Sequence, residues 1–165
     1  MGSNLKLKNI SPSLSTQNDV EIQLAKYKLR KFCRISDLGE IISYLCDDVF
    51  IINITKESKL VFLVGYTPQD KVTLGSIINK YGDPDFLVTY EVGTTPEYPV
   101  TLVRMYYEKY NMSIETNKQE GNFLSINSDL MISNVGYSRD FPELNYPNIS
   151  KQPWRGYGDY FNHTR

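Results

Sequence analysis

Apolar residues recur twice along the chain with a helical period, and each time a strand-like alternation follows. In the first case Val20, Leu24 and Tyr27 lie at positions i, i+4 and i+7. The sequence STQND (residues 15–19) precedes them and offers side-chain oxygens to the free N–H groups of a helix start. This pattern predicts a helix over residues 16–27. Runs of β-branched and aromatic residues then predict strands at residues 31–35, 41–46, 49–55 and 60–64.

The second helical pattern is sharper than the first. Leu74, Ile77, Ile78 and Tyr81 form one stripe, which Thr73 can cap and Gly82 can end. Strands are predicted at residues 86–92, 100–107, 111–116 and 123–127, the last two as a hairpin around residues 118–121. From residue 128 onward the periodicity fades, and we expect extended coil.

The two patterns read as a tandem repeat. The segment CDDVFIINITKESKLVFLV (Cys46 to Val64) can be overlaid on YEKYNMSIETNKQEGNFLS (Tyr107 to Ser125), with strand, polar turn and strand in one order. We expect an α+β fold of helix-plus-hairpin repeats, with an antiparallel sheet, two short helices on one face and the other face open. The expected divisions are a flexible arm (1–13), a first repeat (14–66), a second repeat (67–127) and an extended aromatic tail (128–165), within a single compact domain.

The length and net charge of the chain limit the classes of function that it can have. A chain of 165 residues with 41% hydrophobic residues is ordinary for a folded protein. Its formal net charge of −1 gives no bulk attraction for nucleic acid or anionic lipid. The basic residues at 26–34 fit a helix C-terminus and the solvent face of the next strand. No run reaches the roughly 18 apolar residues that span a bilayer. We therefore expect no nucleic-acid partner, and membrane attachment only through an N-terminal anchor that these residues do not contain.

The two cysteines, Cys33 and Cys46, fall on strands that a turn at residues 36–40 would pair. They can form a disulfide in an oxidising compartment, or remain as two buried thiols. The sequence leaves both interpretations open.

Residues with catalytic or metal-binding chemistry are sparse. The only histidine, His163, is the third residue from the C-terminus, a position that usually frays. The carboxylate pairs Asp47/Asp48 and Asp83/Asp85 coincide with predicted turns, where aspartate serves local hydrogen bonds. Two cysteines and one histidine give no zinc pattern, and no calcium, dinucleotide or phosphate-binding loop is recognisable. We expect no catalytic residue, no metal and no cofactor.

Aromatic residues supply the candidate contact surface. Tyr90, Arg104 and Tyr106 fall on neighbouring predicted strands, and the loop of residues 93–98, which ends in Tyr98, joins those strands. In the tail, Trp154, Tyr157, Tyr160 and Phe161 either pack on the sheet and close the core or form a recognition patch, because such residues anchor both cores and interfaces. The predicted partner-binding residues are Tyr90, Tyr98, Arg104, Tyr106, Trp154 and Tyr157.

The second repeat carries a family resemblance. The segment VTLGSIINKYGDPDFLVTYEVG (residues 72–93) resembles the helix-then-strand signature of small bacterial envelope lipoproteins of the SmpA/OmlA-like type and of the tandem β-lactamase-inhibitory-protein-like fold. Thr73, Ile77, Ile78, Gly82 and Pro84 match it, as does the strand from residue 86. The first half, LSTQNDVEIQLAKY (residues 14–27), has the Ser-Thr lead and the helix but lacks the Gly-x-Pro exit. The resemblance covers residues 14–127 and leaves the tail unexplained.

The resemblance implies a non-enzymatic scaffold or inhibitor that holds a protein partner on an open sheet. Our prediction is such a binding protein of the bacterial cell envelope. It is extracytoplasmic, in the periplasm or at the cell surface, if residues 1–3 replace a removed signal or lipid-anchor segment, and cytoplasmic otherwise. The alternatives are a hydrolase of unknown class that uses clustered carboxylates, and a cytosolic immunity-type protein that blocks a partner enzyme.

Overall fold

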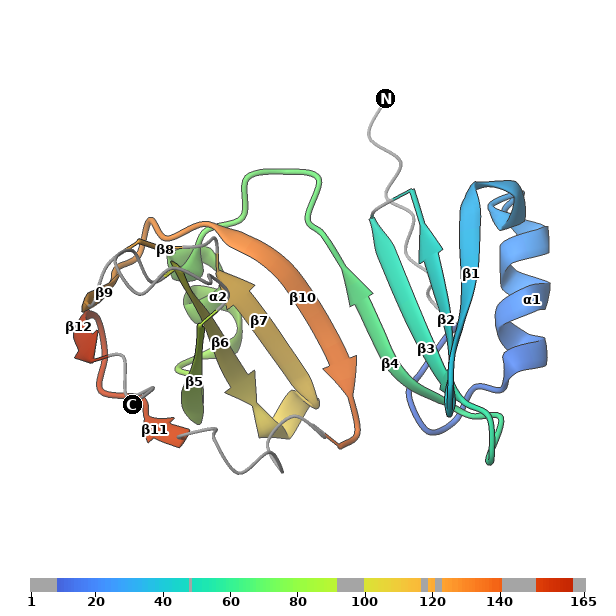
Figure 1. The fold of residues 1–165 in the computed structure, drawn as a ribbon. Helices are drawn as coiled ribbons and strands as arrows, with labels where there is room; N and C mark the ends of the chain where they lie inside the picture. Colours follow the sequence, from blue (N-terminus) through green and yellow to red (C-terminus); the bar gives the residue numbers. More distant parts are fainter. Residues whose placement is uncertain are drawn as a thin grey trace. The chain divides into compact units, whose positions relative to one another are not determined.

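The protein has a mixed α+β fold that is mostly β (Figure 1). The computed structural model describes residues 9–47, 49–91, 100–116, 119–120, 123–140 and 151–161. The chain divides into two units: residues 1–69 with 136–140, and residues 70–135 with 141–165. Within the described residues, no helix is both long and apolar enough to cross a membrane.

The first unit is a helix followed by an antiparallel meander. The helices are α1 (Gln17–Lys26) and the short 3-10 helix η1 (Arg30–Phe32), and the strands are β1 (Cys33–Leu38), β2 (Ile41–Cys46), β3 (Phe50–Thr55) and β4 (Val61–Tyr66). The hydrogen-bonded order is β1–β2–β3–β4, so each strand pairs with its neighbour in sequence. Residues 136–138, the end of a later strand, are counted with this unit.

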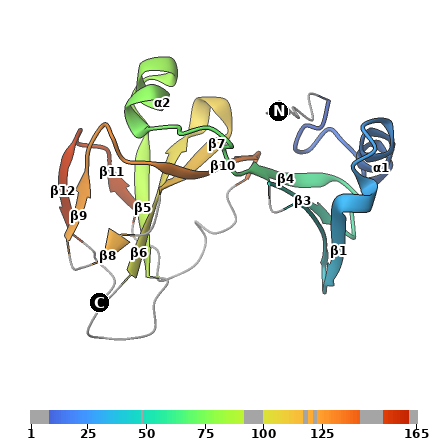
Figure 2. The same ribbon diagram turned by 90° about the horizontal axis from the view of Figure 1, so that it is seen from above.

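A capping box starts α1, and an apolar stripe attaches it to the sheet. The Thr16 hydroxyl accepts from the Asp19 backbone N–H, and the Asp19 carboxylate accepts from the Thr16 backbone N–H. Val20 and Leu24 are fully buried in one cluster with side chains of β2 and β3, including Tyr44 and Ile52. Both ribbon views show α1 on one side of this sheet (Figures 1 and 2).

The second unit also begins with a helix, but its strands are less regular. Its helices are α2 (Leu74–Tyr81) and the 3-10 helix η2 (Glu108–Tyr110). Its strands are β5 (Phe86–Glu91), β6 (Val100–Tyr107), β7 (Met112–Thr116), β8 (Gln119–Glu120), β9 (Phe123–Ile126), β10 (Ile132–Ser138), β11 (Lys151–Pro153) and β12 (Gly158–Phe161). The order is β10–β7–β6–β5–β11, with β8 beside β6, while β9 and β12 form a separate two-stranded sheet.

One face of the second sheet forms the interior of its unit. On β6, Thr101, Val103, Met105 and Tyr107 share this face and are all buried. From α2, Leu74 is buried, and the ring of Tyr81 contacts that of Tyr107. Thr73 caps the helix, and Gly82 ends it with a positive φ of 85°, a conformation that favours glycine.

Both predicted helices are confirmed, as are the predicted strands of the first unit and the strands β5 and β6. The predicted hairpin of residues 111–116 with 123–127 is wrong. β7 lies between β6 and β10, whereas β9 pairs with β12 in the other sheet. The expectation of coil from residue 128 is also wrong, because β10 is a seven-residue strand that pairs with β7.

The ends of the chain need one further correction. Residues 1–8 of the expected flexible arm lie outside the described residues, but residues 9–13 are attached to the first unit. Ile10 is buried in its core, and the Ser13 backbone N–H donates to the Val61 carbonyl at 2.7 Å. The loose part of the arm therefore cannot extend as far as residue 13.

Candidate binding surface

Arg104, one of the predicted contact residues, has a neighbour on each adjacent strand. Arg104 lies opposite Val88 on β5 and opposite Glu115 on β7. Tyr90 lies two positions further along β5, and its side chain is outside the described residues. Tyr98 and the rest of the predicted contact loop, residues 93–98, are outside them as well.

Arg104 and Glu115 form a cross-strand ion pair. One terminal guanidinium nitrogen lies 2.6 Å from Glu115 Oε2, and Nε donates to the same oxygen at 3.2 Å. The side chains are 29% and 17% exposed, so the pair is partly desolvated, and removing one partner would leave a poorly solvated charge. Arg104 can still meet a partner, but its guanidinium is already engaged.

Tyr106 requires a correction, because its side chain is fully buried rather than exposed. Its ring stacks on Phe86, directly opposite on β5, with ring centroids 4.8 Å apart and an interplanar angle of 14°. A large ring that stacks on a cross-strand neighbour supplies core area. Tyr106 therefore contributes to packing and is not available to a partner in this structure.

The aromatic tail divides between core and surface. The Tyr160 side chain is buried: its hydroxyl accepts from the Arg155 backbone N–H at 2.9 Å and donates to the Gly156 carbonyl at 2.8 Å. Trp154 is half-buried, with ring centroids 6.2 Å from Tyr160 and 6.0 Å from Tyr157. Tyr157 is 49% exposed, and the Phe161 side chain is outside the described residues.

The structure does not bring Tyr157 together with Arg104. The proximity of Tyr157 contributes to raising the pKa of Tyr107, after burial and Asp83, which are the larger causes. Tyr107 belongs to the interior face of β6, whereas Arg104 belongs to the opposite face. Tyr157 and Arg104 therefore do not share one face of β6.

Sequence reasoning missed a second surface, on the first unit. The face of its sheet opposite the α1 cluster carries apolar side chains that remain partly exposed, and we call it the open face. Its apolar members are Leu38, Ile41, Leu45, Ile51 and Leu63. Leu38 is 61% exposed, and the others are half-buried. The signal was present in β2 and β3, where apolar residues occupy both odd and even positions, a pattern typical of strands covered on both faces.

Polar groups lie among these apolar side chains. Ser43 on β2 and Asn53 on β3 face each other in the register, and Asn53 also lies opposite Leu63. The Asn53 side-chain oxygen is buried and has no hydrogen-bond partner among the described residues. An acceptor left in this state costs about 1–3 kcal/mol.

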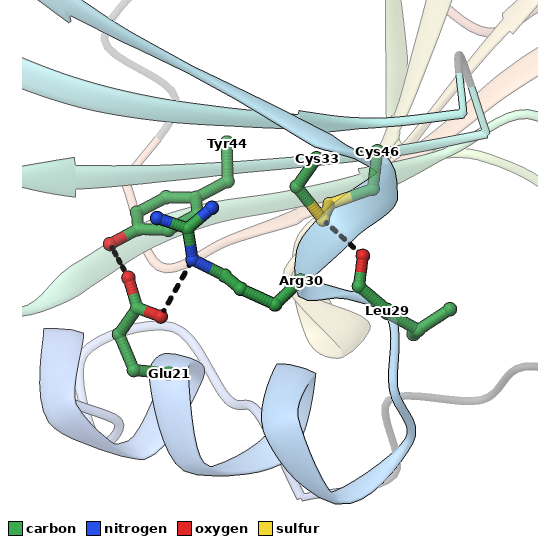
Figure 3. The surroundings of a disulfide bond; sticks show 6 residues. All are labelled: Glu21, Leu29, Arg30, Cys33, Tyr44 and Cys46. Atoms are coloured by element: carbon green, nitrogen blue, oxygen red, sulfur yellow. Dashed lines mark hydrogen bonds and ion pairs between the residues drawn. A yellow bond between two sulfur atoms is a disulfide. The ribbon is translucent and has the colours of Figure 1, made fainter.

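On the other face of the first sheet, a polar network links β2 to α1, and a disulfide joins β1 to β2 (Figure 3). The Tyr44 hydroxyl donates to Glu21 Oε1 at 2.8 Å, and Arg30 Nε pairs with Glu21 Oε2 at 3.0 Å. Burial is the main cause that raises the pKa of Tyr44. Cys33 and Cys46 face each other in the register and are joined by a disulfide with an S–S distance of 1.99 Å. These contacts link β2 to α1 and β1 to β2 behind the open face.

The described residues contain no cluster of three or more His, Cys, Asp or Glu side chains that could hold a metal ion. Comparison with family models, with curated proteins and with solved structures finds no match to the chain.

Proposed function

We propose that this chain is a non-catalytic binding protein that holds a protein partner on the open face of its first unit. The observation that carries the proposal is the set of partly exposed apolar side chains on a sheet face opposite the α1 cluster. Contiguous apolar surface of this kind marks interaction sites when polar groups accompany it. The Arg104–Glu115 pair of the second unit is a further candidate contact, and it would contribute specificity more than affinity.

We propose in addition that the two units are copies of one helix-plus-strands module with its helix on one sheet face. Each begins with a threonine-capped helix, Thr16 before α1 and Thr73 before α2. In each, four strands follow that are neighbours in hydrogen-bonded order: β1–β2–β3–β4 and β5–β6–β7–β10. Between β7 and β10 the second unit inserts β8 and β9. A tandem module supports the resemblance to envelope lipoproteins and to the β-lactamase-inhibitory-protein-like fold.

The disulfide favours an extracytoplasmic location for this activity. Cross-links such as Cys33–Cys46 persist in oxidising compartments and are rare in the reducing cytosol. The proposal therefore places the protein in the bacterial envelope or at the cell surface, ahead of the cytosolic immunity-type alternative. A hydrolase would need convergent carboxylates, and Asp83 and Asp85 are both exposed at a turn.

Site-specific photo-crosslinking in native extract tests the proposed surface. A photoreactive residue at Leu38, on the open face, should give a discrete protein adduct that mass spectrometry identifies. The matched control is Ile22, an apolar residue of α1 that is 53% exposed. Adducts at position 22 with none at position 38 would contradict the proposal, since apolar exposure alone would then explain capture.

A further inference from the structure

The first sheet ends in a strand that has no neighbour on its outer side among the described residues. β1 pairs with β2 alone, through six consecutive residue pairs from Cys33 opposite Cys46 to Leu38 opposite Ile41. The pairing has no bulge, and the disulfide joins its first pair. An edge strand of this kind presents backbone N–H and C=O groups that can pair with another chain.

The hydrogen-bond pattern identifies the backbone groups of β1 that face outward. The Asp47 backbone N–H donates to the Phe32 carbonyl at 3.2 Å, just outside the disulfide-bonded pair. The two cysteines are therefore a non-hydrogen-bonded pair, and such pairs alternate with hydrogen-bonded ones in an antiparallel ladder. By this alternation, Ile35 and Asp37 turn their N–H and C=O groups away from β2. The part of the chain that the structure describes supplies no hydrogen-bond partner for these four groups.

β1 differs from the edge strand of the second sheet in how well it resists pairing. Proteins block exposed edges with short strands, bulges, prolines and lysines. β11, at the edge of the second sheet, is three residues long and contains Lys151 and Pro153. β1 has six residues and contains neither lysine nor proline, and its Ile35 and Leu38 side chains are 39% and 61% exposed. Its edge is therefore the more open of the two to an added strand.

The two charged residues of β1 differ in whether they have a partner. The Asp37 carboxylate, on the α1 side of the sheet, pairs with Lys56 Nζ at 2.5 Å. The exposed Arg34 side chain, on the open face, has no ion-pair partner within the described ranges. An added strand would place one of its own side chains directly beside Arg34, where a carboxylate would complement the charge.

A second copy of the chain meets this requirement poorly. Symmetric antiparallel pairing of two β1 strands keeps the faces of the sheet continuous only when it is centred on a residue. Centred on Ile35, it places Arg34 opposite Ser36 and supplies no carboxylate. Centred on Asp37, it places two carboxylates directly opposite each other, which is destabilising. A strand from a different protein is free of both restrictions.

We propose that the protein partner adds an extended segment to the outer edge of β1 as an antiparallel strand. Its backbone exchanges two hydrogen bonds with Ile35, where its own side chain is apolar. The next residue of the segment lies opposite Arg34 and is acidic. The residue three positions before the one at Ile35 is apolar and lies beside Leu38 on the open face. The inference rests on the proposed function in taking the occupant to be the partner of the open face, and it adds how that partner binds.

Titration of the full chain with the peptide acetyl-Thr-Leu-Thr-Thr-Val-Glu-Thr-amide, followed by two-dimensional NMR, tests the inference. In the proposed register its valine pairs with Ile35, its glutamate with Arg34 and its leucine with Leu38. Amide signals of residues 33–38 should shift. The same peptide N-methylated at its valine keeps every side chain but loses one backbone donor, so it should bind at least fivefold more weakly. Equal affinity of the two peptides, or no binding by either, would overturn the inference.

Substitutions at Ile35 separate backbone pairing from side-chain contact. Ile35→Pro removes the outward N–H but no bond to β2, and edge strands tolerate proline in that orientation. The matched control Ile35→Ala keeps the N–H. Proline should weaken peptide binding at least fivefold more than alanine does, while the urea midpoint of the first unit stays similar in both variants. Equal peptide affinities of the two folded variants would contradict strand addition.

Three outcomes separate this inference from the proposed function. Peptide binding that N-methylation weakens, without any adduct at Leu38, would support strand addition and count against the proposed function alone. An adduct at Leu38 whose partner binds Ile35→Pro as tightly as the natural chain would overturn strand addition alone. Sedimentation of the natural chain as a dimer that Ile35→Pro dissociates would make a second copy the occupant, and would overturn the assignment to a different protein.

Discussion

Opening the Cys33–Cys46 disulfide should destabilise the first unit while leaving the second nearly unchanged. The bond joins residues 13 apart in sequence and pins the edge strand β1 to β2. β1 buries little side-chain area of its own, since none of its six residues is fully buried. The cross-link is therefore a main restraint on this strand, and the double variant Cys33→Ala/Cys46→Ala removes it.

The expected loss follows from the chain entropy that the bond removes from the unfolded state. A closed loop of this length corresponds to about 3 kcal/mol at 25 °C. Cys46 is buried in the core cluster, so its replacement by alanine also loses a little packing. Reduction would also change one polar contact of the disulfide. Cys33 Sγ lies 3.3 Å from the Leu29 carbonyl oxygen. A disulfide sulfur carries no proton, but the free thiol could donate a weak hydrogen bond there.

Urea unfolding measures the loss, provided that each unit has its own probe. The only tryptophan, Trp154, belongs to the second unit, so its fluorescence follows that unit. Hydrogen exchange of the β2 and β3 amides follows the first. With a slope of about 2 kcal/mol per M, a loss of 3 kcal/mol lowers the first-unit midpoint by roughly 1.5 M.

Reductant supplies the control. It should reproduce the effect in the natural sequence and have no effect on the double variant. A loss of first-unit stability below about 1 kcal/mol would refute the reasoning, because the backbone hydrogen bonds between β1 and β2 would then be enough to hold β1 in place. A shift seen only in Trp154 fluorescence would refute the division into units.

Two further predictions concern packing and acid stability. Tyr106→Ala should lower the free energy of unfolding by about 3–5 kcal/mol, because it removes a fully buried ring that stacks on Phe86. The control Tyr157→Ala, at an exposed site, should lower it by less than about 1 kcal/mol. Equal losses of stability in calorimetry would show that Tyr106 is not a core residue. The hydrogen bond from the Thr16 backbone, and to a smaller extent that from its hydroxyl, lowers the pKa of Asp19 below its ordinary value of 3.8. The stability that the cap contributes is therefore present above pH 3.8 and is lost as the pH falls through the folded-state pKa. The stability difference between the natural chain and Asp19→Asn should accordingly vanish in acid unfolding series once the pH lies below the folded-state pKa of Asp19. A difference that persists there would show that the charge is not its source.

The helices could be predicted because their signals are local. For α2, the Thr73 cap, the apolar stripe and Gly82 all lie within ten residues, and each favours the same boundaries. The β7–β9 hairpin failed for the opposite reason. The true partner of β9 is β12, more than thirty residues further along the chain, and no local pattern encodes that pairing. β10 was missed because its burial does not alternate and it contains Gly136, so it lacks the period of two.

The binding surfaces show a related limit. Alternation along β6 correctly separates Arg104 and Tyr106 from Val103 and Met105, but it does not reveal how deeply each face is covered. Tyr106 was therefore assigned to the surface although it is core. The ring contacts of Tyr81 with Tyr107 and Tyr110 join α2, β6 and η2, and residue spacing alone does not predict them. In contrast, the sequence alone shows that apolar residues occupy both odd and even positions of β2 and β3.

The affinity of the purified chain for the protein identified by crosslinking at Leu38 tests the proposed function most directly. Calorimetric titration should compare the natural chain with Leu38→Glu, on the open face, and with Ile22→Glu, on the exposed side of α1. A charge buried in an apolar interface should lower affinity at least tenfold for Leu38→Glu, while Ile22→Glu binds as tightly as the natural chain. Equal affinities for all three proteins would contradict partner binding through the open face.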